Sequence, residues 1–197
     1  MEYRRLKLAR VTGVRSYRRV FIIATEGSRT EPLYFKMFNS SETTVTVQCV
    51  TGGTASSPEA VLERMKQYLE NNKLQRNYEA WVVVDKDAWS KESLDALHAW
   101  AASNAHNYGL AVSNPKFEYW LLLHFEDGNN VANGNVCLIR LKKYLPNYEK
   151  GNLETAKLRP NIMTAAERAK RRDRPPSPKW PNGTGTTVYR LVEKLLG

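Results

Sequence analysis

Apolar residues in this chain follow two patterns that together predict an alternation of strands and helices. Four short runs are mainly apolar, and the first has no polar alternation: residues 20–24, 45–50, 81–84 and 109–112. Such runs are typical of strands buried on both faces of a parallel sheet. Residues 58–71 and 90–107 instead place apolar side chains three or four positions apart, which is the spacing of one helix face. This order predicts right-handed βαβ units, and hence an α/β fold with a mostly parallel four-stranded sheet and flanking helices.

Capping residues predict where two further helices begin. Thr30 is expected to cap the helix after the first strand, with Glu31 in its first turn. Asn114 is expected to cap the helix after the fourth strand, with Pro115 at its first position and apolar residues continuing to Phe125. Both helices would therefore follow a strand directly.

The last third of the chain is less regular and is expected to be largely helical. Residues 137–144 and 161–172 have helical spacing. Residues 174–185 contain four prolines and two glycines, which predicts an extended connector. Residues 186–196 are expected to form a final helix whose apolar stripe docks on the sheet core.

Length favours one substantial domain with a small appendage, because 197 residues suffice for a single core. We expect a basic N-terminal lead at residues 1–19 and a central α/β core at residues 20–126. Residues 127–197 are expected to form a basic helical region whose last helix packs on that core.

The composition favours a soluble globular protein, with 42% hydrophobic and 25% charged residues. No apolar run approaches the ~20 residues that a membrane helix needs, and no signal peptide is expected. Cys49 and Cys137 are far apart and lack the spacing of metal ligands. They are therefore expected to be buried free thiols in the reducing cytoplasm.

The formal net charge of +10 favours a polyanionic partner, above all a nucleic acid, because neutralised phosphates release counterions. A solvated basic surface and contact with anionic lipid are the alternatives on charge alone. Residues 1–19 carry seven Arg and Lys against one acid, and residues 140–179 carry twelve against four. Basic arms thus flank a more acidic centre.

Acidic residues follow three of the four predicted strands. Glu26 follows the first strand, Asp85 and Asp87 end the third, and Glu118 lies in the helix after the fourth. In parallel sheets ligands bind at the carboxyl ends of the strands, and residues i and i+2 of an extended segment point the same way. Carboxylates are the ligands that Mg²⁺ or Mn²⁺ prefers. The pattern therefore predicts a divalent metal site, although a solvated loop for the Asp pair and a helix-dipole role for Glu118 remain open.

Basic and polar residues near this predicted site are candidates for holding phosphate: Ser28, Arg29 and Lys116. A second group in the last third is expected to follow a nucleic-acid backbone: Arg140, Lys142, Lys143, Lys170, Arg171, Arg172 and Arg174. Solvation in loops or on helix faces is the alternative for both groups.

Other chemically versatile residues are better explained by structure. His124 follows three leucines and is expected to be a partly buried, hydrogen-bonded histidine rather than a proton shuttle. Trp89, Trp100 and Trp120 could stack on bases, but aromatic residues at helical spacing are more typical of a core.

Four segments resemble the RloB family over nearly the whole chain. They are ATEGSRTEPLYF (24–35), VVDKD (83–87), SNPKFEYWLLLHF (113–125) and NGTGTTVY (182–189). The resemblance implies a Toprim-like, Rossmann-like sandwich with its catalytic core at residues 20–126. It also implies general acid/base chemistry at Glu26, Mg²⁺ binding at Asp85 and Asp87, a role in phage defence, and often a partner ATPase. Position 89 is Trp, whereas the wider superfamily often has a third acid there; Glu118 is a candidate to replace that acid.

Three functions follow as hypotheses. The first is a metal-dependent nuclease that cleaves DNA or RNA in the cytoplasm during phage defence. The second is a non-catalytic nucleic-acid-binding or scaffolding module that acts with a partner ATPase. The third is a primase-like nucleotidyl transferase, which ranks last because little in the sequence indicates a pocket for a nucleotide base.

Overall fold

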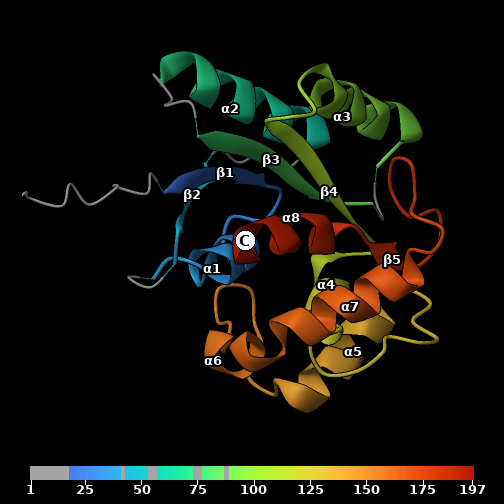
Figure 1. The fold of residues 1–197 in the computed structure, drawn as a ribbon. Coiled ribbons are helices and arrows are strands. Elements are labelled where there is room, and N and C mark those ends of the chain that lie inside the picture. The colour runs from blue at the N-terminus through green and yellow to red at the C-terminus, as the bar shows by residue number, and fades with distance from the viewer. Residues whose placement is uncertain (1–17, 41–42, 53–56, 73–76, 87–88) are drawn as a thin grey trace, which may run out of the picture.

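The computed structural model shows a five-stranded sheet between two helical layers (Figure 1). It describes residues 18–40, 43–52, 57–72, 77–86 and 89–197. Across the sheet the strands are β2 (Val45–Val50), β1 (Arg19–Thr25), β3 (Tyr78–Asp85), β4 (Tyr108–Asn114) and β5 (Gly185–Thr186).

The first four strands are parallel, as predicted, and the fifth was missed. β1 pairs with β2 on one side and β3 on the other, and β3 pairs with β4, all in parallel. β5 pairs antiparallel with β4 through Ser113 and Thr186. Two residues are too few for a strand pattern to show, so the sequence indicated only a connector and the start of a helix there. The sheet is therefore five-stranded and mostly parallel.

Helices α2 (Pro58–Asn71) and α3 (Lys91–Ser103) cover one face of the sheet (Figure 1). Each is preceded by a capping serine whose side chain accepts a backbone N–H: Ser57 from Ala60 and Ser90 from Ser93. Their apolar side chains pack against every second residue of the strands. The fully buried members of this layer are Ile22, Ala24, Val61, Met65, Ala80, Val82, Leu97 and Val112.

Helices α1 (Thr30–Lys36), α4 (Phe117–Leu122) and α8 (Val188–Leu196) lie on the other face (Figure 1). The intervening strand residues, such as Phe21 and Ile23, point into this layer. The last helix, α8, packs against the sheet with its apolar stripe buried: Val188, Leu191, Val192 and Leu195.

A further helical layer packs beneath α4 and α8 (Figure 1). It contains α5 (Gly134–Tyr144), α6 (Thr155–Leu158), a 3₁₀ turn (Arg159–Asn161) and α7 (Ile162–Arg172). Its buried side chains, including Leu141 of α5, belong to the same apolar cluster as Phe21 of β1. The C-terminal helices therefore extend the core of the sheet.

Two predicted caps are wrong. Thr30 is the first residue of α1, and Arg29 precedes it without a side-chain capping bond. Asn114 ends β4, while Lys116 occupies the position before α4. The amide of Asn114 instead donates to the carbonyl of Gly183 at 2.8 Å, so it holds the connector rather than the helix.

Within the described ranges no helix is long and apolar enough to cross a membrane. Both cysteines are free thiols; Cys137 is buried, as expected, whereas Cys49 is only half-buried. Burial raises the pKa of Cys137 to about 12 and that of Cys49 to about 11, so neither thiol ionises readily near neutral pH.

Candidate functional site

The carboxyl ends of β1 and β3 define the candidate site. The chain leaves β1 for β2 on one side and later crosses to β3 on the other side. Adjacent strands whose connections diverge in this way leave a crevice at their carboxyl ends, where α/β proteins bind ligands. Glu26 directly follows β1 and Asp85 ends β3, so the fold itself brings these two acids to the crevice.

A cavity of about 610 Å³ opens at this edge, and we call it the acidic cavity. Four carboxylates line it, from Glu26, Glu31, Asp85 and Glu118. Three cations also line it: Arg29, Lys116 and Lys150. Charges of both signs in one cavity suit a ligand that presents phosphate together with a divalent cation.

Glu26 and Asp85 are oriented by N–H donors. Oε2 of Glu26 accepts the backbone N–H of Asp85 and the indole N–H of Trp89, each at 3.1 Å. Oδ1 of Asp85 accepts the backbone N–H of Phe117 at 2.8 Å. These bonds link the ends of β1 and β3 to the start of α4, so the two side chains are held in defined positions.

Glu31 is the acid that the sequence analysis missed as a site residue. Its side chain is buried, with 7% exposed, and Oε1 accepts the N–H of Gly27 at 2.9 Å. Burial raises the pKa of Glu31, and the charges of Glu118 and Glu26 raise it further against the opposing effect of backbone hydrogen bonds. Glu31 therefore retains a proton at higher pH than an exposed glutamate does. Its position five residues after Glu26, in the first turn of α1, was the available signal.

Glu118 lies in the first turn of α4 and accepts a hydrogen bond from a residue that follows it by 30 positions. The hydroxyl of Tyr148 donates to its Oε1 at 2.9 Å. Burial first, and then the charge of Glu118, raise the pKa of Tyr148 well above the usual range. The Tyr148 hydroxyl therefore stays protonated and acts as a donor to Glu118.

The basic residues predicted near the site are in the cavity. Ser28, Arg29 and Lys116 line it, and Lys150 is an addition that the sequence did not reveal. Two glycines leave room for the long side chains. A Cβ atom at Gly134 would lie 3.1 Å from the side chain of Lys116, and one at Gly151 would lie 2.9 Å from that of Arg29.

The basic residues predicted in the last third do not line the acidic cavity. Arg140, Lys142 and Lys143 are on α5, Lys170, Arg171 and Arg172 end α7, and Arg174 follows. Several are engaged within the molecule. Arg140 pairs with Glu126, Lys170 with Glu193 at 2.7 Å and Arg171 with Asp127 at 2.7 Å, while Arg172 donates to the side chain of Asn129. Part of the positive charge is thus balanced locally.

The donor types in the acidic cavity fit a hard divalent cation, since all four acids offer carboxylate oxygens. Asp87 lies outside the described residues. Within the residues that are described, no group of three or more His, Cys, Asp or Glu side chains is arranged to hold a metal ion. Trp89 contributes an N–H donor to Glu26 and no ligand oxygen.

His124 is a structural histidine, as expected. It is buried with 2% exposed, between the hydroxyl of Tyr34 at 3.2 Å and the carbonyl of Trp120 at 3.1 Å. A carbonyl only accepts, so Nδ1 carries the proton and Nε2 accepts from Tyr34. Burial lowers the pKa of His124 to about 4, which keeps the ring neutral.

Comparison with known proteins gives one match. The model of a family described as RloB-like protein matches residues 21–195, which is nearly the whole chain. No curated protein matches the chain, and no solved structure does. Every residue that lines the acidic cavity falls within the matched range.

Proposed function

This chain belongs to the RloB-like family, and we propose that it is a metal-dependent nuclease with a Toprim-like core that serves phage defence. The observation that carries the proposal is the acidic cavity, where Glu26 and Asp85 flank the crevice between β1 and β3. Phosphodiester cleavage needs carboxylates for a divalent cation and cations for the phosphate. The acidic cavity offers both kinds of side chain.

The proposed roles divide between the acidic and the basic side chains of the cavity. Glu26 and Asp85, with Asp87 and Glu118, would hold Mg²⁺ or Mn²⁺. When bound, the cation would supply the positive charge that offsets negative charge developing on the phosphate. Arg29, which lines the same cavity, would orient the phosphate oxygens.

Proton transfer would fall to the glutamates. Glu26 is held at Oε2 by two N–H donors, which fixes its direction toward the crevice. A positioned carboxylate of this kind can take a proton from the attacking water. Glu31, whose pKa is raised mainly by burial, would hold a proton in the cavity and limit repulsion among the carboxylates.

The test is cleavage of labelled DNA and RNA over a titration of Mg²⁺ and Mn²⁺. Glu26→Gln should slow cleavage by about 10²–10⁴-fold even at saturating metal, the usual contribution of general acid/base help. Asp85→Asn should weaken metal binding measured by calorimetry. Its Oδ1 can still accept the N–H of Phe117, so the local fold should persist. Glu70→Gln, the same chemical change on the exposed surface of α2, is the matched control.

A non-catalytic binding module is the second candidate. Two observations favour it. The carboxylates of Glu26 and Asp85 already accept N–H groups of the protein, and no group of three or more potential metal ligands is found among the described residues. Cleavage should be tested with the partner ATPase, nucleotide and metal present. If wild-type protein then binds nucleic acid but neither binds metal nor cleaves, the nuclease proposal is rejected in favour of the binding module.

A further inference from the structure

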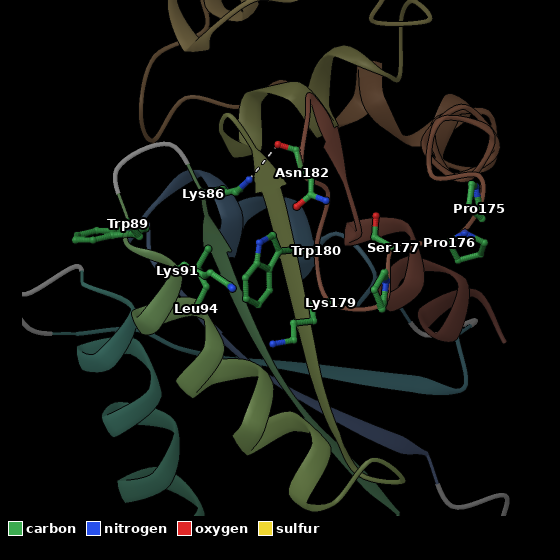
Figure 2. Close-up of a pocket in the computed structure, with 11 residues that line it drawn as sticks. Lys86, Trp89, Lys91, Leu94, Pro175, Pro176, Ser177, Lys179, Trp180 and Asn182 are labelled. Atoms are coloured by element: carbon green, nitrogen blue, oxygen red, sulfur yellow. Dashed lines mark hydrogen bonds between the residues drawn. The ribbon is translucent and has the colours of Figure 1, made fainter.

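Figure 2 shows a second pocket, of about 530 Å³. We call it the tryptophan pocket. It lies between the start of α3 and the connector that follows α7, and its volume is in the range of small-molecule sites. We propose that it binds one unpaired nucleotide of a single-stranded nucleic acid.

The connector that forms one wall is fixed at its beginning by Asp173. This buried carboxylate accepts the backbone N–H of Ser177 at 2.9 Å and the hydroxyl of Tyr189 at 2.9 Å. It also pairs with Arg190 at 2.8 Å, and Arg190 donates to the carbonyl of Ser177 at 2.7 Å. The carboxylate and the guanidinium therefore hold the same turn from two sides.

The other end of the connector is fixed by the ends of β3 and β4. Nζ of Lys86 donates to the carbonyls of Pro181 and Asn182 at 3.3 and 3.1 Å (Figure 2). The amide of Asn114 donates to the carbonyl of Gly183 at 2.8 Å. With both ends tied to the core, the pocket is formed before any ligand arrives, which limits the entropic cost of binding.

Trp180 supplies an aromatic wall. Its side chain is 7% exposed, packs in the apolar cluster of α2 and α3, and meets the ring of His98 edge to face at 6.3 Å. Figure 2 shows it beside Lys91 and Leu94 of α3. The accessible edge of this indole and the exposed prolines of the connector can accept any nucleobase, because every base presents an apolar π-face. The aromatic wall therefore favours a base over a simple anion.

The charge of the lining complements phosphate. Lys86, Lys91 and Lys179 line the pocket, and no acid is among the described residues that line it. Lys179 pairs with Asp95 and Lys86 with the connector, whereas Lys91 is exposed and takes part in none of the ion pairs between described residues. Lys91 is therefore the cation best placed to meet a phosphate.

The pocket also adjoins the candidate site. Successive residues at the end of β3 serve different cavities: Asp85 lines the acidic cavity and Lys86 the tryptophan pocket. Trp89 lines the pocket and donates its indole N–H to Glu26. A base must be unstacked and unpaired to enter such a recess, which selects single strands over duplexes. The link between this pocket and strand cleavage rests on the proposed function, whereas binding itself does not.

The test measures equilibrium binding of a labelled oligothymidylate and of a labelled blunt duplex. Fluorescence anisotropy in the presence of EDTA reports the binding. Lys91→Glu should weaken single-strand binding by about tenfold more than Lys66→Glu, the same charge change at an exposed lysine of α2. Trp180→Leu should also weaken it by about tenfold. Duplex binding should be weaker in wild type and should respond equally to both lysine variants.

Four results would overturn the proposal that this pocket binds a nucleotide: no single-strand binding by wild type, tighter binding of the duplex, equal losses in the two lysine variants, or full competition by a polyglutamate peptide. Where Trp180→Leu fails to fold, as judged by circular dichroism, the lysine pair decides. Because metal is absent, a lack of cleavage does not affect the result. Conversely, Glu26→Gln that binds single strands normally but shows the same cleavage as wild type would reject the proposed function and leave the pocket intact.

Discussion

Replacing Gly27 with alanine tests whether the turn after β1 sets the position of Glu31. Gly27 donates its N–H to Oε1 of Glu31 at 2.9 Å. A methyl group on Gly27 would lie 2.5 Å from Cδ of Glu31 and closer still to both carboxylate oxygens. Heavy atoms in favourable contact are about 3.5–4.0 Å apart, so the carboxylate must move by about 1 Å or more. That movement breaks the bond to the N–H of Gly27.

The cost follows from the burial of the carboxylate. Glu31 is only 7% exposed, so water does not readily replace the lost donor. An unmade hydrogen bond to a buried group costs about 1–3 kcal/mol, and this is the expected loss of unfolding free energy in Gly27→Ala. In a Glu31→Ala background the carboxylate is absent and most of the penalty should vanish. The double-mutant cycle should therefore give a coupling free energy of about 1–3 kcal/mol.

Urea unfolding at neutral pH, followed by circular dichroism, measures all four proteins of the cycle. Gly183→Ala is the control, because a Cβ atom there meets nothing within 4 Å. It should change the unfolding free energy by no more than about 1 kcal/mol. If Gly27→Ala costs the same with and without the Glu31 side chain, the penalty belongs to the backbone and the proposed positioning is refuted.

Three further predictions concern charge. The pKa of Glu31 is raised in the folded protein by burial, so its contribution to stability is fully present below the unfolded value of 4.5 and is lost as pH rises through the folded value. Wild type should therefore lose unfolding free energy relative to Glu31→Gln as pH rises above 4.5, and a constant difference in urea titrations would contradict this. Tyr148→Phe should cost about 1 kcal/mol by removing the donor to Glu118, in the same unfolding assay, and no loss would show that the bond is dispensable. Replacing the three basic residues in the last turn of α7 with alanine should weaken nucleic-acid binding and flatten its salt dependence; unchanged, salt-independent affinity would assign them to intramolecular pairing.

The sheet could be predicted because its strands are buried on both faces. Runs such as residues 20–24 leave no polar alternation, and the helices between them have strong 3–4 spacing. A local sequence pattern does not reveal tertiary contacts. Asn114 has the chemistry of a helix cap, yet its amide bonds the carbonyl of Gly183, which lies 69 residues away. β5 escaped prediction for the same reason, since its two residues form a strand only by pairing with β4.

The candidate site was predictable as far as strand ends determine it. Glu26 and Asp85 follow apolar runs, so topology alone brings them to one edge. From the C-terminal region Tyr148 bonds Glu118 and Lys150 lines the acidic cavity, and nothing in their local sequence indicates this. Glu31 was visible as a first-turn acid, but only its burial gives it a raised pKa and a distinct chemical character.

Trp89 has contacts at both cavities. A third carboxylate at this position would add negative charge beside Glu26 and Asp85, and would repel a polyanion. The indole instead donates to Glu26 at 3.1 Å and also lines the tryptophan pocket. The residue that donates to Glu26 at one cavity thus supplies apolar surface to the next. If the pocket binds a nucleotide as proposed, a ligand that contacts Trp89 would touch the donor that orients Glu26.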